Sequence, residues 1–208
     1  VRLVEVKTIW RPERRCMSTA LVRYRNQWFC RFHDRIQAGG KKRITIIRSA
    51  DGQTWQMAAR LSGFDLPCSR FSVQPGKRLR LFSATGGGDP NAAYQPVGWS
   101  SRDGIRWTKY SPAIEGDFLM NRMVWYRDQG WGVASRYRTH RGRMSLMTTE
   151  DGTTFDDRVP RFSPGFGYDP SIVFDDGSGA FCLVPRTRLP EVVAPSAFLG
   201  ASESPFRD

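Results

Sequence analysis

Arginines, carboxylates and one tyrosine recur at matching points of this 208-residue chain, directly before or after short apolar runs. The arginines of this set are Arg70, Arg122, Arg136 and Arg186, and its other members are Asp34, Tyr168 and Asp169. A guanidinium group is a planar fork of N–H donors that binds a carboxylate through two parallel hydrogen bonds. The set therefore predicts a site for an anionic ligand, if the fold brings its members together.

The elements that must position these residues are indicated by a seven-residue phrase that occurs three times, at residues 49–55, 101–107 and 149–155. The phrase begins with Ser or Thr, has Asp-Gly at its third and fourth positions, and ends with Trp or Phe. Its aspartates are 52 and then 48 residues apart (positions 51, 103 and 151). A period near fifty built from short apolar runs is typical of a β-propeller. The predicted fold class is all-β, with blades that are four-stranded antiparallel sheets.

The phrase has a structural explanation. Its hydroxyl and carboxylate can accept hydrogen bonds from backbone N–H groups and close a tight turn, and its glycine supplies a positive φ. The final aromatic ring is expected to turn back against its own sheet. Each copy has one carboxylate at a useful position, which favours a structural role over catalysis or calcium binding. The residues predicted to form these turns are Asp51, Gly52, Trp55, Asp103, Gly104, Trp107, Asp151, Gly152 and Phe155.

The whole chain, residues 1–208, is predicted to form a single propeller domain. Apolar runs and turn residues divide it into blades of about 15–61, 69–113, 121–162 and 168–208. Residues 1–10 alternate like a strand and are expected to complete a blade from the other end of the chain. Two arrangements stay open: four blades close a small ring, or these blades belong to a longer propeller.

Strand order predicts where a site would form. If the first strand of each blade begins at one end of the central channel, the second strand ends there and the repeated turns lie at the opposite end. The arginines and carboxylates named above then gather at one end of the channel. His33 and His140 are expected to be solvated or hydrogen-bonded loop residues, not catalysts.

Composition narrows the partners. The net charge is +12, which makes anionic glycans, carboxylate-bearing substrates and nucleic acids plausible partners. The arginine-rich segment 136–143 suits phosphate or sulfate groups, or it is a solvated hairpin, and the scattered placement of arginine argues against a nucleic-acid function.

The four cysteines lack metal-ligand spacing, so neither a metal nor a cofactor is predicted. No apolar run approaches the ~18 residues of a membrane helix. No signal peptide is visible, but the chain begins at Val1, so the compartment stays open.

The repeated phrase resembles the Asp box, or BNR repeat, of the sialidase (neuraminidase) superfamily. Residues 15–208 are similar to bacterial exo-α-sialidase-like proteins, through the segments ITIIRSADGQTW, LVRYRNQWFCRF and NRMVWYRDQGWGV. The resemblance implies a six-bladed propeller, of which about four blades are present. It also implies a glycoside hydrolase ancestry and recognition of a terminal anionic sugar. Asp boxes specify the fold more strongly than the activity.

The resemblance also implies roles for individual residues. Sialidases hold the substrate carboxylate with three arginines and use an Asp acid/base and a Tyr nucleophile, an exception among glycosidases. The candidate substrate-binding residues are therefore Arg70, Arg122, Arg136 and Arg186, with Arg122 and Arg186 the best placed. Ser18-Thr19-Ala20 stands where the acid is expected, which leaves Asp34 and Asp169 as replacements and Tyr168 as nucleophile. The opposing interpretations are exposed arginines on an arginine-rich surface, and a non-catalytic propeller that binds glycans or proteins.

Overall fold

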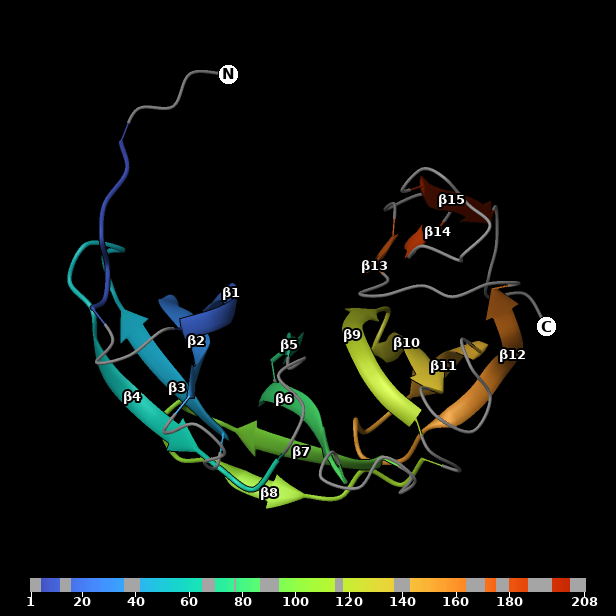
Figure 1. Cartoon of the computed structure of the whole chain (residues 1–208), viewed down its shortest axis with the longest axis horizontal. Coiled ribbons are helices and arrows are strands. Elements are labelled where there is room, and N and C mark those ends of the chain that lie inside the picture. Colours follow the sequence, from blue (N-terminus) through green and yellow to red (C-terminus); the bar gives the residue numbers. More distant parts are fainter. Residues whose placement is uncertain are drawn as a thin grey trace.

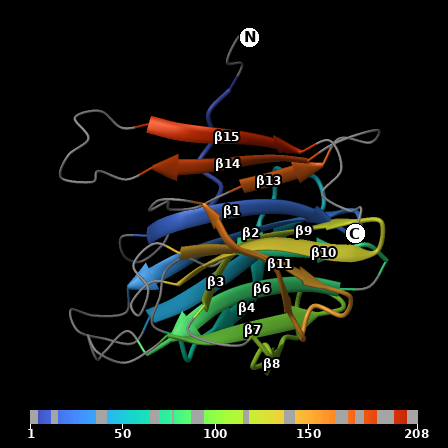
Figure 2. The ribbon, with the colours of Figure 1, turned by 90° about the vertical axis from the view of Figure 1, so that its right-hand side faces the viewer.

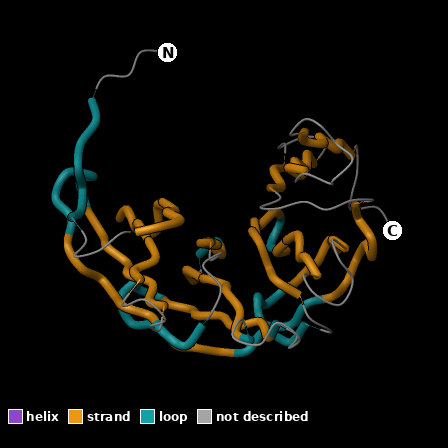
Figure 3. Tube along the Cα trace, in the orientation of Figure 1, coloured by secondary structure: helices purple, strands orange, loops and turns teal. Residues whose placement is uncertain are grey.

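The computed structural model describes residues 5–11, 16–35, 42–64, 70–76, 78–86, 94–114, 118–136, 143–163, 171–174, 180–186 and 196–202. Within these ranges every regular element is a β-strand (Figure 3). The same ranges contain no helix long and apolar enough to cross a membrane. The all-β class predicted from the sequence is confirmed.

The first two blades are antiparallel sheets whose strands pair in chain order. Blade one consists of β1 (Cys16–Tyr24), β2 (Gln27–Arg35), β3 (Lys42–Ser49) and β4 (Gln56–Leu61). Blade two consists of β5 (Arg70–Gln74), β6 (Arg78–Thr85), β7 (Gln95–Ser101) and β8 (Thr108–Tyr110).

The next two blades repeat this pattern. Blade three consists of β9 (Phe118–Tyr126), β10 (Gln129–Arg136), β11 (Arg143–Thr149) and β12 (Asp156–Ser163). Blade four has three described strands, β13 (Ser171–Phe174), β14 (Ala180–Arg186) and β15 (Ser196–Ser202). The four sheets follow one another around an arc, with β1, β5, β9 and β13 on its inner side (Figure 1). A view from the side shows β13, β14 and β15 as one antiparallel sheet (Figure 2).

In blades one to three, the burial of the described residues falls from the middle strands to the outer edge. In β6 the six residues between the two ends are all buried, because this strand has a neighbouring blade on each face. The outer strand β8 has no buried residue. Buried polar side chains such as Arg80 and Ser83 share the middle strands with apolar ones, whereas the described residues of the outer strands are mostly half-buried or exposed.

Three apolar joints hold successive blades together. Phe29 and Ile46 of blade one pack with Leu81 and Trp99 of blade two in the first joint. Further members of the same cluster come from both sheets. The second joint includes Phe82, Met123, Met147 and Phe155, and the third includes Val124, Trp131, Leu146 and Ile172. The core is therefore divided into layers between blades, as a propeller requires.

In blades one and three, the hairpin between the first and second strands is tight, as the sequence predicts. Residues Arg25 and Asn26 both have positive φ, 47° and 61°, and Arg127 and Asp128 repeat this with 47° and 64°. Positive φ at both central residues is the signature of a type I′ turn, whose twist matches that of the strands it joins.

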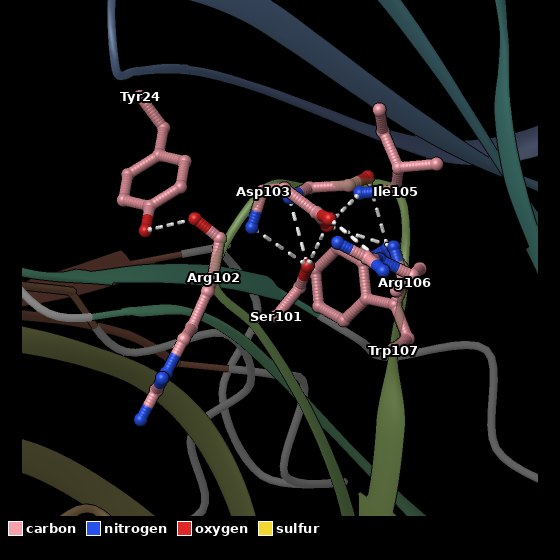
Figure 4. Close-up of polar contacts among 8 residues, drawn as sticks. Tyr24, Ser101, Arg102, Asp103, Ile105, Arg106 and Trp107 are labelled. Carbon is pink, nitrogen blue, oxygen red and sulfur yellow. Dashed lines mark hydrogen bonds and ion pairs between the residues drawn. The ribbon is translucent and has the colours of Figure 1, made fainter.

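The repeated phrase forms the turn that follows the third strand. In blade two, Asp103 Oδ1 accepts hydrogen bonds from Ser101 Oγ (3.0 Å) and from the N–H groups of Ile105 and Arg106 (both 2.8 Å). Figure 4 shows these bonds converging on the carboxylate. The indole N–H of Trp107 donates to the carbonyl of the turn glycine at 3.0 Å. The backbone donors hold the pKa of Asp103 well below its usual range. We call this arrangement the Asp–Gly turn.

The other two phrases form the same turn. Asp51 Oδ1 accepts bonds from the N–H groups of Gln53 and Thr54 at 2.8 Å, and Asp151 Oδ1 accepts from Thr153 and Thr154 at 2.7 and 2.8 Å. The three turn glycines have φ between 72° and 75°. The three phrases thus share one hydrogen-bond pattern, in which each carboxylate is engaged by the backbone of its own turn.

Each Asp–Gly turn after the first also receives a side chain from the preceding blade. A Cβ placed on Gly104 would overlap the ring of Phe29, and one placed on Gly152 would overlap the guanidinium of Arg80. Phe29 and Arg80 occupy equivalent positions in the second strands of their blades. The residue before Phe29, Trp28, pairs with the first residue of the phrase in blade one, and the residue before Arg80, Leu79, does the same in blade two. The turn therefore helps to join blades, beyond closing its own hairpin.

Residues 5–11 contain no strand, which corrects the expectation that residues 1–10 complete a blade. Instead, Lys7 Nζ donates to Gln53 Oε1 at 2.7 Å, and the rings of Trp10 and Phe32 lie 6.3 Å apart. Side-chain contacts hold this segment against blade one, and no described strand pairs with its backbone.

Candidate functional site

The strand registers define two ends of the blades. We call upper rim the end where β1, β5, β9 and β13 begin and where the second strand of each blade ends. The lower rim is the end that carries the hairpins between first and second strands together with the Asp–Gly turns. Along β2, from Gln27 to Asp34, seven residue steps separate the two rims by about 23 Å.

Arg70 and Arg122 occupy equivalent positions on neighbouring inner strands, with Arg70 as the first residue of β5 and Arg122 in the middle of β9, where its side chain reaches Ser171 at the beginning of β13. Arg70 lies four residues before Gln74, the last residue of β5, and Arg122 lies four residues before Tyr126, the last residue of β9. In both blades that last residue pairs with the first residue of the next strand, so the two arginines are the same distance from the hairpin. The two inner strands β5 and β9 also lie in contact. Two arginines are thus carried at the same level of neighbouring inner strands, and their role in ligand binding stays a prediction.

Arg122 connects two blades. Its Nη1 donates to Ser171 Oγ, at the beginning of the next inner strand, at a distance of 3.1 Å, and the arginine is exposed. A guanidinium has five N–H donors, so this bond fixes its orientation and still leaves donors for a ligand.

Asp34 is engaged within its own blade. Its Oδ2 accepts hydrogen bonds from Arg43 Nη2 (3.2 Å) and Nε (3.3 Å), and from the hydroxyl of Thr45. Asp34 and Arg43 face each other across the β2–β3 ladder. These contacts make Asp34 an anchor for neighbouring donors, and its proposed catalytic role stays a prediction.

The prediction that His33 is a loop residue is wrong. This residue lies inside β2, is 5% exposed, and its ring meets that of Phe64 edge-on at 5.3 Å. Burial lowers the pKa of His33 to about 3, and the charges of Arg31, Lys42 and Arg70 act in the same direction against a smaller opposing effect of Asp34. The histidine is therefore neutral at physiological pH, chiefly because it is buried.

Sequence reasoning missed Arg31, the most deeply buried charged residue described, with 0% exposure. It lies in β2 on the same face as Phe29 and His33, since the three alternate along the strand. That alternation was a usable signal, because it places a cation at a position where the strand face is apolar. A buried guanidinium adds to the positive potential that Arg70 and Lys42 create nearby.

The remaining predicted residues are located only in part. Arg136 and Arg186 are the last residues of β10 and β14, so their backbones lie at the upper rim. Their side chains, together with Tyr168, Asp169 and His140, lie outside the described residues. Among described residues, no group of three or more His, Cys, Asp or Glu side chains could hold a metal ion.

The fold and the arginine-bearing rim define a β-propeller of the kind found in glycoside hydrolases. The chain is similar to an α-L-arabinanase of Penicillium chrysogenum solved with arabinobiose, with a TM-score of 0.71 and 14% identity over 92% of this chain. It is also similar to an α-L-arabinofuranosidase of Fusarium graminearum solved with an iminosugar inhibitor (TM-score 0.67, 12% identity, 91% of this chain). A family 117 glycoside hydrolase of Zobellia galactanivorans follows at a TM-score of 0.54 and 11% identity over 92% of this chain.

This chain spans 64%, 63% and 63% of the lengths of these three structures. No protein-family model matches the sequence, and no curated protein sequence matches it. At such low identities the likeness supports the fold alone, and the resemblance to sialidases remains a hypothesis.

Proposed function

We propose that this chain is part of a carbohydrate-active propeller whose upper rim recognises a terminal anionic sugar, as in the sialidases that its Asp–Gly turns resemble. The observation that carries the proposal is the pair Arg70 and Arg122 at equivalent positions of neighbouring inner strands. Beside the larger effect of burial, the charges of Arg31, Lys42 and Arg70 also lower the pKa of His33, which supports a cationic environment near this rim. Oligosaccharides and sugar analogues bound to the structural neighbours support a carbohydrate as partner.

The chemistry of the pair suits a carboxylated sugar. A forked guanidinium binds a carboxylate through two hydrogen bonds, and such charge-assisted bonds are about twice as strong as neutral ones. Arg136 and Arg186 are proposed to add further cations at the ends of their strands. Tyr168 and Asp169 are proposed as nucleophile and acid if the whole protein is a glycosidase. A tyrosine nucleophile avoids a second negative charge beside an anionic substrate.

A binding function without turnover is the second candidate, and the environment of Asp34 favours it. The carboxylate of Asp34 holds Arg43 and Thr45 in place, so it is not poised to donate a proton to a leaving group. In this alternative the same arginines bind an anionic glycan, and no bond is cleaved.

The binding test compares a sialic acid with its methyl ester, which has the same shape without the negative charge. Arg122→Ala should weaken binding of the acid by about 1.5–3 kcal/mol, the range for a hydrogen bond to a charged group. Arg127→Ala is the matched control, because Arg127 lies on the lower-rim hairpin of the same strand and stacks over Tyr126 at 5.1 Å. Equal losses in the two variants, or equal affinity for acid and ester, would refute the assignment of the upper rim.

The activity test uses a fluorogenic sialoside between pH 4 and 8. We expect little or no turnover from this chain, because Ser18-Thr19-Ala20 stands where sialidases are expected to carry their acid. Catalytic groups that act as a unit lose nearly all activity when one of them is missing. Turnover that disappears in Tyr168→Phe or Asp169→Asn would instead support the enzyme and would reject the binding-only alternative.

A further inference from the structure

The lower rim carries a second cation-rich site, which is a pocket of about 540 Å³ between three blades. Its walls include Arg25 from the β1–β2 hairpin, Arg78 and Arg80 from β6, and Arg102 from the Asp–Gly turn of blade two. Glu150 and Asp151, from the Asp–Gly turn of blade three, complete this set. Four guanidinium groups thus share the pocket with two carboxylates.

Two of these charges belong to the framework. Arg80 is 4% exposed, and its guanidinium donates to the carbonyl oxygens of Gly152 (3.1 Å) and Asp151. The carboxylate of Asp151 is occupied by the N–H and hydroxyl donors of its own turn. The charges that remain for a ligand are therefore those of Arg25, Arg78, Arg102 and Glu150, with a positive balance.

The three arginines other than Arg80, of which Arg25 and Arg102 are exposed and Arg78 is half-buried, are positioned by contacts that leave most of their N–H donors unused. The guanidinium of Arg25 stacks over the ring of Tyr24 at 5.7 Å, and the hydroxyl of Tyr24 donates to the backbone carbonyl of Arg102 at 3.0 Å. Figure 4 shows the side chain of Arg102 pointing away from the bonds around Asp103. Arg78 Nη1 donates to Ser100 Oγ at 3.4 Å. One tyrosine thus links the two arginines that border the pocket from different blades.

We propose that this pocket binds the phosphate or sulfate group of a modified sugar. Tetrahedral oxyanions offer three or more acceptor oxygens, which suits several guanidinium groups converging from different directions. Glu150 supplies the opposite chemistry, since its carboxylate can accept a hydrogen bond from a sugar hydroxyl. The volume falls within the range of ordinary small-ligand pockets, about 300–1,000 Å³. Neither Arg70 nor Arg122 lines this pocket, so the proposal does not depend on the function proposed for those residues.

The test titrates the purified chain with glucose 6-phosphate, glucose 6-sulfate and glucose at constant ionic strength, followed by calorimetry. Either ester should bind more tightly than glucose, and the tighter ester identifies the oxyanion. Arg102→Ala should weaken ester binding about tenfold or more, and Arg102→Lys should weaken it less, because a point charge replaces the fork. Arg106→Ala is the matched control: it removes an arginine of the same turn whose side chain is 92% exposed and paired with Asp103 at 3.0 Å.

The outcomes separate cleanly. Loss of ester binding in Arg102→Ala, with retention in Arg106→Ala and in the upper-rim variant Arg122→Ala, supports the proposal. Equal affinity for the esters and glucose overturns it, as does equal weakening by Arg102→Ala and Arg106→Ala, which would show only general screening. Loss of ester binding in Arg122→Ala, with retention in Arg102→Ala, would place the ligand on the upper rim and would also overturn it. Melting temperatures of all variants verify that each is folded.

Discussion

Replacing Arg80 tests whether an arginine of one blade holds the Asp–Gly turn of the next. Its guanidinium donates to Gln74 Oε1 (3.2 and 3.4 Å), the hydroxyl of Tyr110 (3.2 Å), and the carbonyls of Gly152 and Asp151. Arg80→Ala removes all of these bonds and leaves the Asp151 carbonyl short of a donor, whereas the Gly152 carbonyl keeps the Tyr110 hydroxyl at 3.1 Å.

The magnitude follows from those contacts. A hydrogen bond from a charged donor contributes about 1.5–3 kcal/mol, and leaving a buried acceptor unpaired costs about 1–3 kcal/mol. Because the Gly152 carbonyl keeps the Tyr110 hydroxyl and Gln74 borders the lower-rim pocket, where water can replace the guanidinium, we expect Arg80→Ala to lower the free energy of unfolding by about 4 kcal/mol. Arg80→Lys keeps the charge but offers one nitrogen in place of three, so a loss of about 2 kcal/mol is expected.

Equilibrium urea unfolding, followed by tryptophan fluorescence, measures these losses. Arg106→Ala is the control, because its pair with Asp103 is on the surface and such pairs contribute about 0–1 kcal/mol. A loss below about 1 kcal/mol in Arg80→Ala, or one equal to that of the control, would refute the idea that this side chain joins blades two and three.

Two further predictions concern the joint between blades one and two and the response to acid. Gly104→Ala should destabilise the protein by about 2–4 kcal/mol more than Gly76→Ala. Both glycines have a positive φ, but only a Cβ on Gly104 would overlap the ring of Phe29. Similar melting temperatures for the two variants would contradict this expectation. The pKa of about 3 for His33 lies below its unfolded value near 6.5, so the unfolded chain takes up the proton first as the pH falls. Stability is therefore complete above pH 6.5 and should fall by about 2 kcal/mol between pH 6.5 and 5, a slope that urea unfolding should no longer show in His33→Gln.

The sequence alone determined the features that depend on neighbouring residues. The spacing of the phrase around Asp51, Asp103 and Asp151 predicted the turns, the four-stranded sheets and the all-β class. These features are local: a hydroxyl, a carboxylate and a glycine within four positions suffice to close the turn, and a period of two marks a strand. The same strand order predicted matching positions for Arg70 and Arg122 on neighbouring inner strands, because each lies four residues before the hairpin that ends its strand.

Only the tertiary structure decided which polar residues lie between blades. Arg80 and His33 read in the sequence as one more arginine and a loop histidine, yet both are buried where two sheets meet. The lower-rim pocket likewise joins Arg25, Arg102 and Glu150, which lie 77 and 48 positions apart (102 − 25 and 150 − 102). Such contacts depend on how one sheet packs against the next, and that packing is set by the shapes of the whole apolar faces rather than by any local pattern.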